Sequence, residues 1–258
     1  MTRARAARAV PILLLALALL PAPANASQPI TLNVSLSPER LGGSTTMIFG
    51  FKIATPNGVF PPPLVAMDLL YPAHIGLVTS ELGLKNCTTP ILEEFGPEGC
   101  PADSLMGSGT ATVDIPFGSE PIHETAQIST WMGPLHNGEL QLLFDAEGYT
   151  PVYAQLVFPG LVTHAQSPYG GQLSTTIPVI ESLPGAADHP VVTQMRATIG
   201  PMNITYYLHV RGHAVAYHPT GLSLPTTCPK HGFKFAATFA FLDGTHATAH
   251  HTVPCPRS

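Results

Sequence analysis

The chain has 258 residues and carries 11 Lys and Arg against 16 Asp and Glu, so its formal net charge is −5 at pH 7. Only 10% of the residues are charged, where about 25% is usual in soluble domains, so Thr, Ser, Gly, Pro and His must supply much of the polar surface. The chain has no basic patch, which excludes nucleic acid as a partner and disfavours anionic membrane surfaces.

The first 26 residues predict a secretory signal peptide. They contain three arginines near the start, an unbroken apolar run at 10–20 and an A-x-A cleavage signal at 24–26. A membrane anchor is the alternative, but the apolar run is shorter than the roughly 20 residues that span a bilayer. We therefore predict a secreted, extracellular protein of residues 27–258, with no transmembrane segment after cleavage.

The remainder of the chain predicts an all-β fold. Its 28 prolines and 23 glycines interrupt the sequence too often for long helices. The segments between them alternate in polarity and are rich in Val, Ile, Thr, Phe and Tyr, which is typical of strands. Strands are predicted at 30–37, 45–54, 64–71, 109–115, 126–131, 139–145, 152–158, 173–178, 191–199, 203–210, 214–218, 233–241 and 246–253.

Short strands at regular spacing suggest an antiparallel β-sandwich with minimal helix content. Residues 27–258 could form one large sandwich or two small ones, with a possible subdivision near 116–121. Helical turns are expected only near 90–95 and in the loop at 73–83.

The last two predicted strands form a hairpin whose register can be derived. Odd-numbered positions of 233–241 are apolar, and the odd-numbered positions of 246–253 are the more apolar set there. A two-residue turn at Asp243-Gly244 would pair odd with even positions, whereas a three-residue loop at 242–244 pairs odd with odd. We therefore predict the longer loop, with Gly244 in the left-handed conformation that this loop requires.

Four cysteines lie in the predicted mature chain, namely Cys87, Cys100, Cys228 and Cys255. An even number in an exported chain implies disulfides, and three pairings exist. We favour Cys87–Cys100 and Cys228–Cys255, because each pair is local and lies in a similar Pro/Gly-rich setting. A metal site is the alternative, but the C-x-x-C spacing is missing.

Two blocks of sequence resemble a known group. CPADS followed by GSGTA, beginning at Cys100, and the terminal block from Cys228 to Pro256 resemble recurring blocks of exported, disulfide-containing β-sandwich proteins of high-GC soil bacteria. The resemblance implies the sandwich fold and the two local disulfides, and it implies no activity and no catalytic residue.

No catalytic residue, cofactor site or metal site is predicted. The G-x-S-x-G motif is missing, and His123-Glu124 begins like a zinc-protease motif, but Gln127 stands where its second His belongs. Asp145 and Glu147 would share one face of a strand. We interpret them as a solvated strand end, with an acid/base pair or a calcium site as the alternative.

Histidine is unusually frequent, with 12 residues in the chain. His209 and His213 are four residues apart, as are His246 and His250. On a strand this spacing spans about 13 Å, which is too far for one ion. A metal site would therefore need partners from neighbouring strands.

Two functions remain open. The first is a non-enzymatic structural, adhesive or ligand-binding module that binds an extracellular glycan or protein surface. The second is a carbohydrate-active hydrolase with Asp and Glu from different strands as acid and base. A raised pKa of one carboxyl group in a groove, beside a second ionised one, would favour the hydrolase.

The histidines predict a charge reversal in mild acid. Cleavage of the leader leaves eight Lys and Arg against 16 Asp and Glu, so the mature chain carries −8 near neutral pH. Histidines that titrate near about 6.5 would add up to 12 positive charges by pH 5. We expect the electrophoretic mobility of the mature protein to reverse sign between about pH 5 and 6.5. Mobility that stays negative down to about pH 4.5 would contradict this.

Overall fold

The computed structural model describes residues 29–55, 59–77, 80–117, 120–182 and 188–256. The predicted signal peptide and its cleavage site lie outside these residues. Within the described part of the chain, no helix combines the length and the apolar character needed to cross a membrane.

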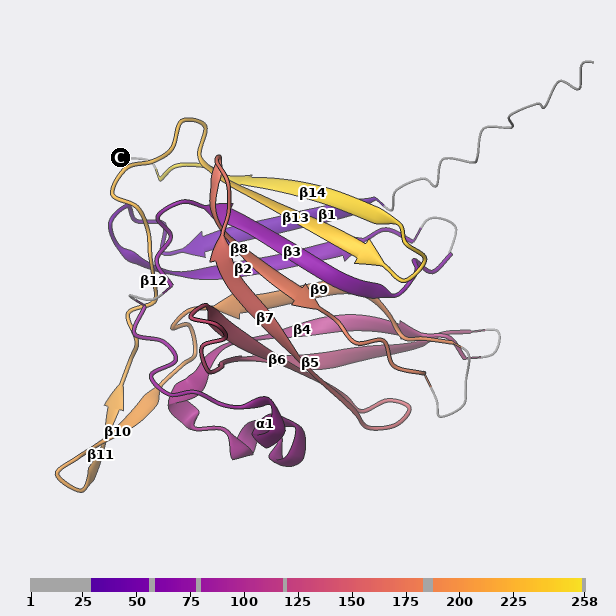
Figure 1. Cartoon of the computed structure of the whole chain (residues 1–258), viewed down its shortest axis with the longest axis horizontal. Helices are drawn as coiled ribbons and strands as arrows, with labels where there is room; N and C mark the ends of the chain where they lie inside the picture. The colour runs from indigo at the N-terminus through magenta and orange to yellow at the C-terminus, as the bar shows by residue number, and fades with distance from the viewer. Residues whose placement is uncertain (1–28, 56–58, 78–79, 118–119, 183–187, 257–258) are drawn as a thin grey trace, which may run out of the picture.

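The described residues form one large antiparallel sheet, a two-stranded hairpin and very little helix (Figure 1). The twelve strands of the large sheet are β1 (Ile30–Ser37), β2 (Ser44–Ile53), β3 (Leu64–Pro72), β4 (Leu105–Ile115), β5 (Ile122–Met132), β6 (Leu140–Gly148), β7 (Ala154–His164), β8 (Tyr169–Thr176), β9 (Val191–Ile199), β12 (Leu222–Ser223), β13 (Phe233–Phe241) and β14 (His246–Val253). The separate hairpin is β10 (Tyr206–Val210) and β11 (His213–Tyr217).

The all-β prediction is confirmed, and each predicted strand overlaps an observed one. The predicted helical turn near 90–95 corresponds to α1 (Thr89–Phe95), which is followed by the 3-10 turns η2 (Pro97–Gly99) and η3 (Ala102–Ser104). In the described residues of 73–83 the chain forms turns and no helix.

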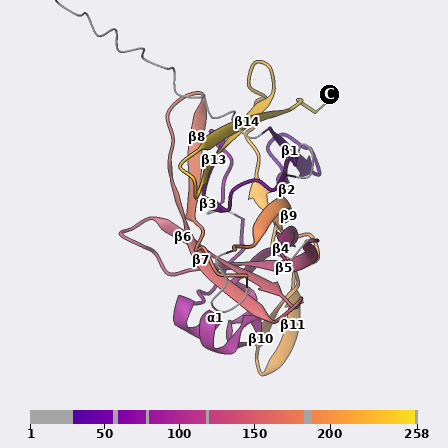
Figure 2. The ribbon, with the colours of Figure 1, turned by 90° about the vertical axis from the view of Figure 1, so that its right-hand side faces the viewer.

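The sheet curves into a nearly closed barrel, so the predicted two-sheet sandwich is not what forms. Its strands follow the order β1-β2-β9-β4-β5-β6-β7-β8-β3-β13-β14, and β12 pairs with β2. The two end strands, β1 and β14, lie side by side (Figures 1 and 2). The pairing is continuous from β1 to β14, and therefore no break divides the strands into two facing sheets. Segment 116–121, where a subdivision was considered, joins β4 to β5, which pair from Leu105 to Ile115.

The terminal hairpin has the predicted register. Phe235 pairs with His251 and Phe239 with Ala247, so odd positions match odd positions. The backbone N–H of Phe241 donates to the carbonyl of Thr245 at 3.0 Å, which closes the three-residue loop, and Gly244 has φ of 81°. The phenylalanines of β13 consequently all point into the barrel.

These phenylalanines build the main hydrophobic core, between β1 and β2 on one side and β3, β13 and β14 on the other. Phe233, Phe235 and Phe239 are almost completely buried. The ring of Phe51 on β2 meets that of Phe239 edge to face, with centroids 4.9 Å apart. This half of the barrel is therefore filled by large side chains.

A small second core lies on the outer surface of the barrel, beneath α1. The structure contains two disulfides, Cys87–Cys100 and Cys228–Cys255, which are the two local pairs that the sequence favours. The first closes the segment that carries α1 and holds it against β5, β6 and β7. Leu92 of α1 and both sulfur atoms pack there against Trp131 of β5 and Leu143 of β6.

Trp131 is the only tryptophan of the chain, so its fluorescence reports on this second core. We expect the double substitution Cys87→Ser/Cys100→Ser to lower the free energy of unfolding by about 3 kcal/mol. We also expect it to shift the emission of Trp131 to longer wavelength in the folded protein, because α1 is no longer tied down and water reaches the indole.

The control is Cys228→Ser/Cys255→Ser, which opens a longer loop, with a sequence separation of 27 instead of 13, far from Trp131. It is expected to cost about 3 to 4 kcal/mol and to leave the emission of the folded protein unchanged. Identical emission spectra for the two double variants would contradict the placement of α1.

Candidate functional site

The half of the barrel formed by β4 to β9 is hollow because several of its inward positions carry very small side chains. Ala111 of β4 lies opposite Ala126 of β5, and Gly148 of β6 lies opposite Ala154 of β7. Each pair places at most two methyl groups where a pair of leucines or phenylalanines would fill the space. The absence of large side chains at these inward positions leaves room inside the sheet.

The resulting cavity has a volume of about 640 Å³. It lies at the end of the barrel where the connections at 149–153 and 177–182 meet the strands, and it is open on one side. Its wall is mainly hydrocarbon. Of the strands that line it, the six neighbours β4 to β9 form most of the wall, and β2 and β3 contribute the rest. The larger apolar residues of this wall are Phe51, Leu64, Met67, Val113, Ile115, Ile128, Phe144, Leu156, Phe158, Val192 and Met195.

Few polar side chains reach the cavity. The hydroxyl of Thr175 donates to the carbonyl of Met67 at 3.1 Å, so its proton is used within the protein. Glu124 of β5 points inward, is 9% exposed and lines the cavity, as does Glu181. Among the described lining residues there is no Lys, Arg or His. The cavity is therefore mainly apolar, and the charged groups of its described lining are both acidic.

The position of Glu124 is fixed by the end of β6. Its Oε1 accepts the backbone N–H of Tyr149 at 3.3 Å. Gly148 lies beside this side chain, since a Cβ atom there would be in ordinary van der Waals contact with Cγ of Glu124, at 3.4 Å. Among the described residues, Glu124 Oε2 has no hydrogen-bond donor, so this oxygen is available to a molecule in the cavity.

His123 lies on the opposite face of β5, because successive side chains of a strand alternate. Its Nδ1 lies 2.6 Å from Oδ1 of Asp114 on β4, at the outer surface. The two residues that begin like a zinc-protease motif therefore face different compartments and cannot act together on one ion or substrate.

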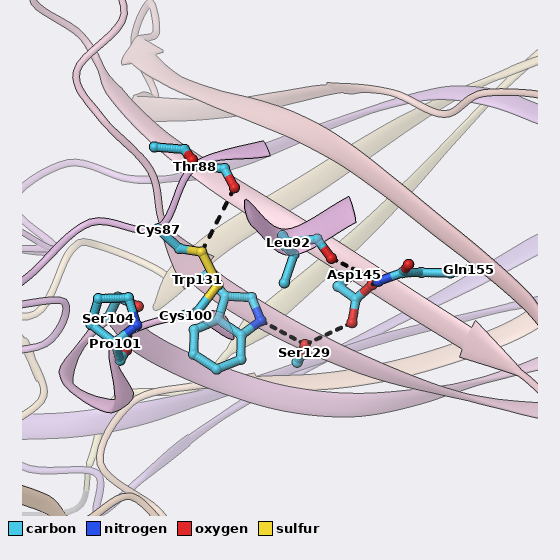
Figure 3. The surroundings of a disulfide bond; sticks show 10 residues. All are labelled: Cys87, Thr88, Leu92, Cys100, Pro101, Ser104, Ser129, Trp131, Asp145 and Gln155. Atoms are coloured by element: carbon cyan, nitrogen blue, oxygen red, sulfur yellow. Dashed lines mark hydrogen bonds between the residues drawn. A yellow bond between two sulfur atoms is a disulfide. The ribbon is translucent and has the colours of Figure 1, made fainter. Parts of the chain in front are cut away.

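Asp145 and Glu147 do share the outer face of β6, as predicted, but Asp145 is not a solvated strand end. It is 1% exposed because α1 covers it. Gln155 Nε2 donates to its Oδ1 at 2.8 Å and to the carbonyl of Leu92 at 3.0 Å, which ties β6 and β7 to α1 (Figure 3). On the other side, Trp131 Nε1 donates to Ser129 Oγ at 2.7 Å, and that hydroxyl donates to Asp145 Oδ2 at 3.4 Å.

Burial raises the pKa of Asp145 above its ordinary value of 3.8, and the negative charge of Glu147 adds to the increase. Hydrogen bonds from Gln155 and Ser129 act in the opposite direction. A raised carboxyl pKa is what the hydrolase hypothesis requires. The location of Asp145, however, does not fit that hypothesis. Asp145 lies sealed beneath α1 and both of its oxygens accept hydrogen bonds, whereas glycoside hydrolysis needs two carboxyl groups that reach one substrate.

Glu147 lies at the outer surface between two tyrosines. The hydroxyls of Tyr149 and Tyr153 donate to its two carboxylate oxygens at 3.1 and 3.2 Å. Their rings are 5.4 Å apart. Each carboxylate oxygen thus accepts one hydrogen bond from a phenol, and Glu147 bridges the two tyrosines.

The histidine pairs do not come together. His209 and His213 lie on opposite strands of the β10–β11 hairpin, at adjacent rungs and so on opposite faces. His246 and His250 are both exposed on β14, four residues apart on one strand. In the residues that the structure describes, no group of three His, Cys, Asp or Glu side chains could hold a metal ion.

The cavity residues were not foreseen from the sequence, although a signal was present. Four of the five inward positions of the predicted strand at 233–241 are Phe, whereas the strands at 109–115 and 126–131 have Ala111 and Ala126 at inward positions. Where the alternation of a strand continues but the buried positions carry small side chains, the pattern indicates space inside the sheet.

Comparison with models of known protein families, with curated proteins and with solved structures finds no match. The resemblance to exported proteins of soil bacteria therefore stays a prediction, and the function is argued from the geometry alone.

The raised pKa of Asp145 has a consequence for stability. The folded protein binds this proton more tightly than the unfolded chain, so the stabilisation is fully present below pH 3.8 and is lost as the pH rises through the higher pKa of the folded state. We expect Asp145→Asn to be more stable than the wild type at pH 7, because the neutral amide can accept from Gln155 through its oxygen and donate to Ser129 Oγ through its NH₂ group without a buried charge. The gain shrinks as the pH falls towards 3.8, which urea denaturation across this range measures.

Asp243 is a control of opposite sign. Hydrogen bonds from the hydroxyl and the backbone N–H of Thr245 lower its pKa, so its contribution is present above 3.8 and lost in acid. Asp243→Asn is expected to be less stable than the wild type at pH 7, and equal to it at low pH. A parallel pH dependence of the two variants would contradict the burial of Asp145.

Proposed function

We propose that this protein binds an apolar or amphiphilic small molecule in the cavity between β4 and β9, as a secreted, non-enzymatic ligand-binding protein. The observation that carries the proposal is the hydrocarbon-lined cavity of about 640 Å³. Sites for small molecules are typically concave, mostly apolar and about 300 to 1,000 Å³ in volume, with a few polar groups that set orientation.

The chemistry of the wall favours a hydrocarbon over the glycan considered at first. Each buried CH₂ group of a ligand is worth about 0.8 kcal/mol. A sugar hydroxyl placed against Val113, Leu156 or Phe158 would lose its hydrogen bonds to water and gain none from these side chains. The ligand is therefore expected to be mainly hydrocarbon.

A secreted location is part of this proposal. Two disulfides in the described chain are consistent with an oxidising, extracellular environment. An apolar molecule outside a cell has low solubility, and enclosure in a protein cavity is the physical means of carrying or sequestering it.

Nile red, a neutral dye whose emission rises and shifts in an apolar environment, tests the proposal. We expect saturable binding to the wild type. Ala126→Phe places a ring in the cavity and is expected to weaken binding at least tenfold, about 1.4 kcal/mol. The variant is expected to remain folded, because the new ring fills empty space rather than displacing packed atoms.

The matched control is Thr125→Phe, which adds the same ring one residue earlier, where the side chain is exposed on the outer face of β5. Its affinity for Nile red is expected to equal that of the wild type. Equal loss in both variants, or wild-type protein that binds no dye, would refute the cavity as a binding site.

A further inference from the structure

We propose that the cavity selects amphiphiles with a cationic, hydrogen-bond-donating head, such as an alkylammonium group, and that Glu124 binds this head. The inference rests on the proposed function and names the class of ligand. Its basis is the pairing of a buried carboxyl group with an otherwise apolar wall.

Glu124 is placed to receive a head group near the end of the cavity. In the ladder it lies opposite Val113, which pairs with Val192. The next inward rung contains Ala111, which pairs with Met195, and Met195 in turn pairs with Phe51. An amphiphile whose head meets Glu124 therefore extends its chain along hydrocarbon towards Phe51 and Met195.

The hydrogen bonding of Glu124 is incomplete within the protein. Oε1 accepts one bond, from Tyr149, and Oε2 has no donor among the described residues. A carboxylate in an apolar setting is costly unless it is paired, and an ammonium group supplies both a charge and up to three donors. Charge-assisted hydrogen bonds of this kind are about twice as strong as neutral ones.

An anionic head finds no equivalent partner. No Lys, Arg or His lies among the described lining residues, and Glu181 adds a second carboxyl group there. The histidines of this end are used elsewhere. His123 pairs with Asp114 on the outer face, and Nδ1 of His189 lies 2.9 Å from the carbonyl of Ile180. A fatty-acid carboxylate would therefore meet like charge in the cavity.

Displacement of Nile red by three ligands with the same chain tests the inference, namely dodecylamine, dodecanol and dodecanoate below their aggregation concentrations. For the wild type we expect dodecylamine to displace the dye at a concentration at least about tenfold below that of dodecanol, and dodecanoate to be the weakest. In Glu124→Gln we expect the advantage of the amine over the alcohol to fall to less than about threefold, because the amide cannot pair with a charge.

Glu94→Gln makes the same change of charge at an exposed position of α1, on the outer surface, and is expected to keep the wild-type order of the three ligands. Equal displacement by amine and acid, or a preference for the amine that persists in Glu124→Gln, would overturn the inference. Both outcomes still require that Nile red binds, so they are distinct from failure of the proposed function, in which neither the dye nor any of the three ligands binds.

Discussion

The number of strands is the constraint on which the rest of this structure depends. A sheet of about eight strands closes around an interior that side chains can just fill. Here eleven strands follow one another from β1 to β14, and the enclosed space exceeds what strand side chains can occupy everywhere. Large side chains fill the interior in one half of the barrel only. Phe residues of β2 and β13 fill one half, and the other half, from β4 to β9, keeps a cavity.

Contacts on the outer surface stabilise the strands that line the cavity. Strands that border empty space lose contacts on their inner face, so β5, β6 and β7 would be weakly held by the interior alone. The segment closed by Cys87 and Cys100 covers these three strands from outside, with Leu92 against Trp131 and Leu143. The Asp145 network then joins α1 to β6 and β7 by hydrogen bonds. The same strands carry the outer face that α1 covers and the inner face that lines the cavity. The outer contacts therefore stabilise the strands around the cavity.

Local features of the fold could be read from the sequence because they depend on neighbouring residues. The period of two located the strands, and the parity of Phe235 and His251 set the register of the last hairpin. The favoured disulfides each join cysteines of one local segment. These inferences needed only pattern, turn chemistry and chain distance.

The features that position the candidate site are not local. A period of two tells which side chains are buried, but not whether they face a second sheet or the interior of a curved one. The insertion of β9 between β2 and β4, and of β3 between β8 and β13, has no signature in a single sequence. Asp145 was expected to be solvated for the same reason, since its burial depends on α1, which is 50 residues away along the chain.

Two departures from good core packing occur on the same wall of the barrel. Ala111, Ala126 and Gly148 leave space, and unfilled space in a core costs about 24 cal/mol per Å³ in large-to-small substitutions. Glu124 introduces a carboxyl group where an apolar side chain would be more stable. Either feature alone would be a local weakness. Together they form an apolar chamber with one polar anchor, and natural proteins depart from the rules of packing chiefly where a site requires it. A ligand that fills the space and pairs with Glu124 would remove both costs at once, so binding and folding are expected to stabilise each other.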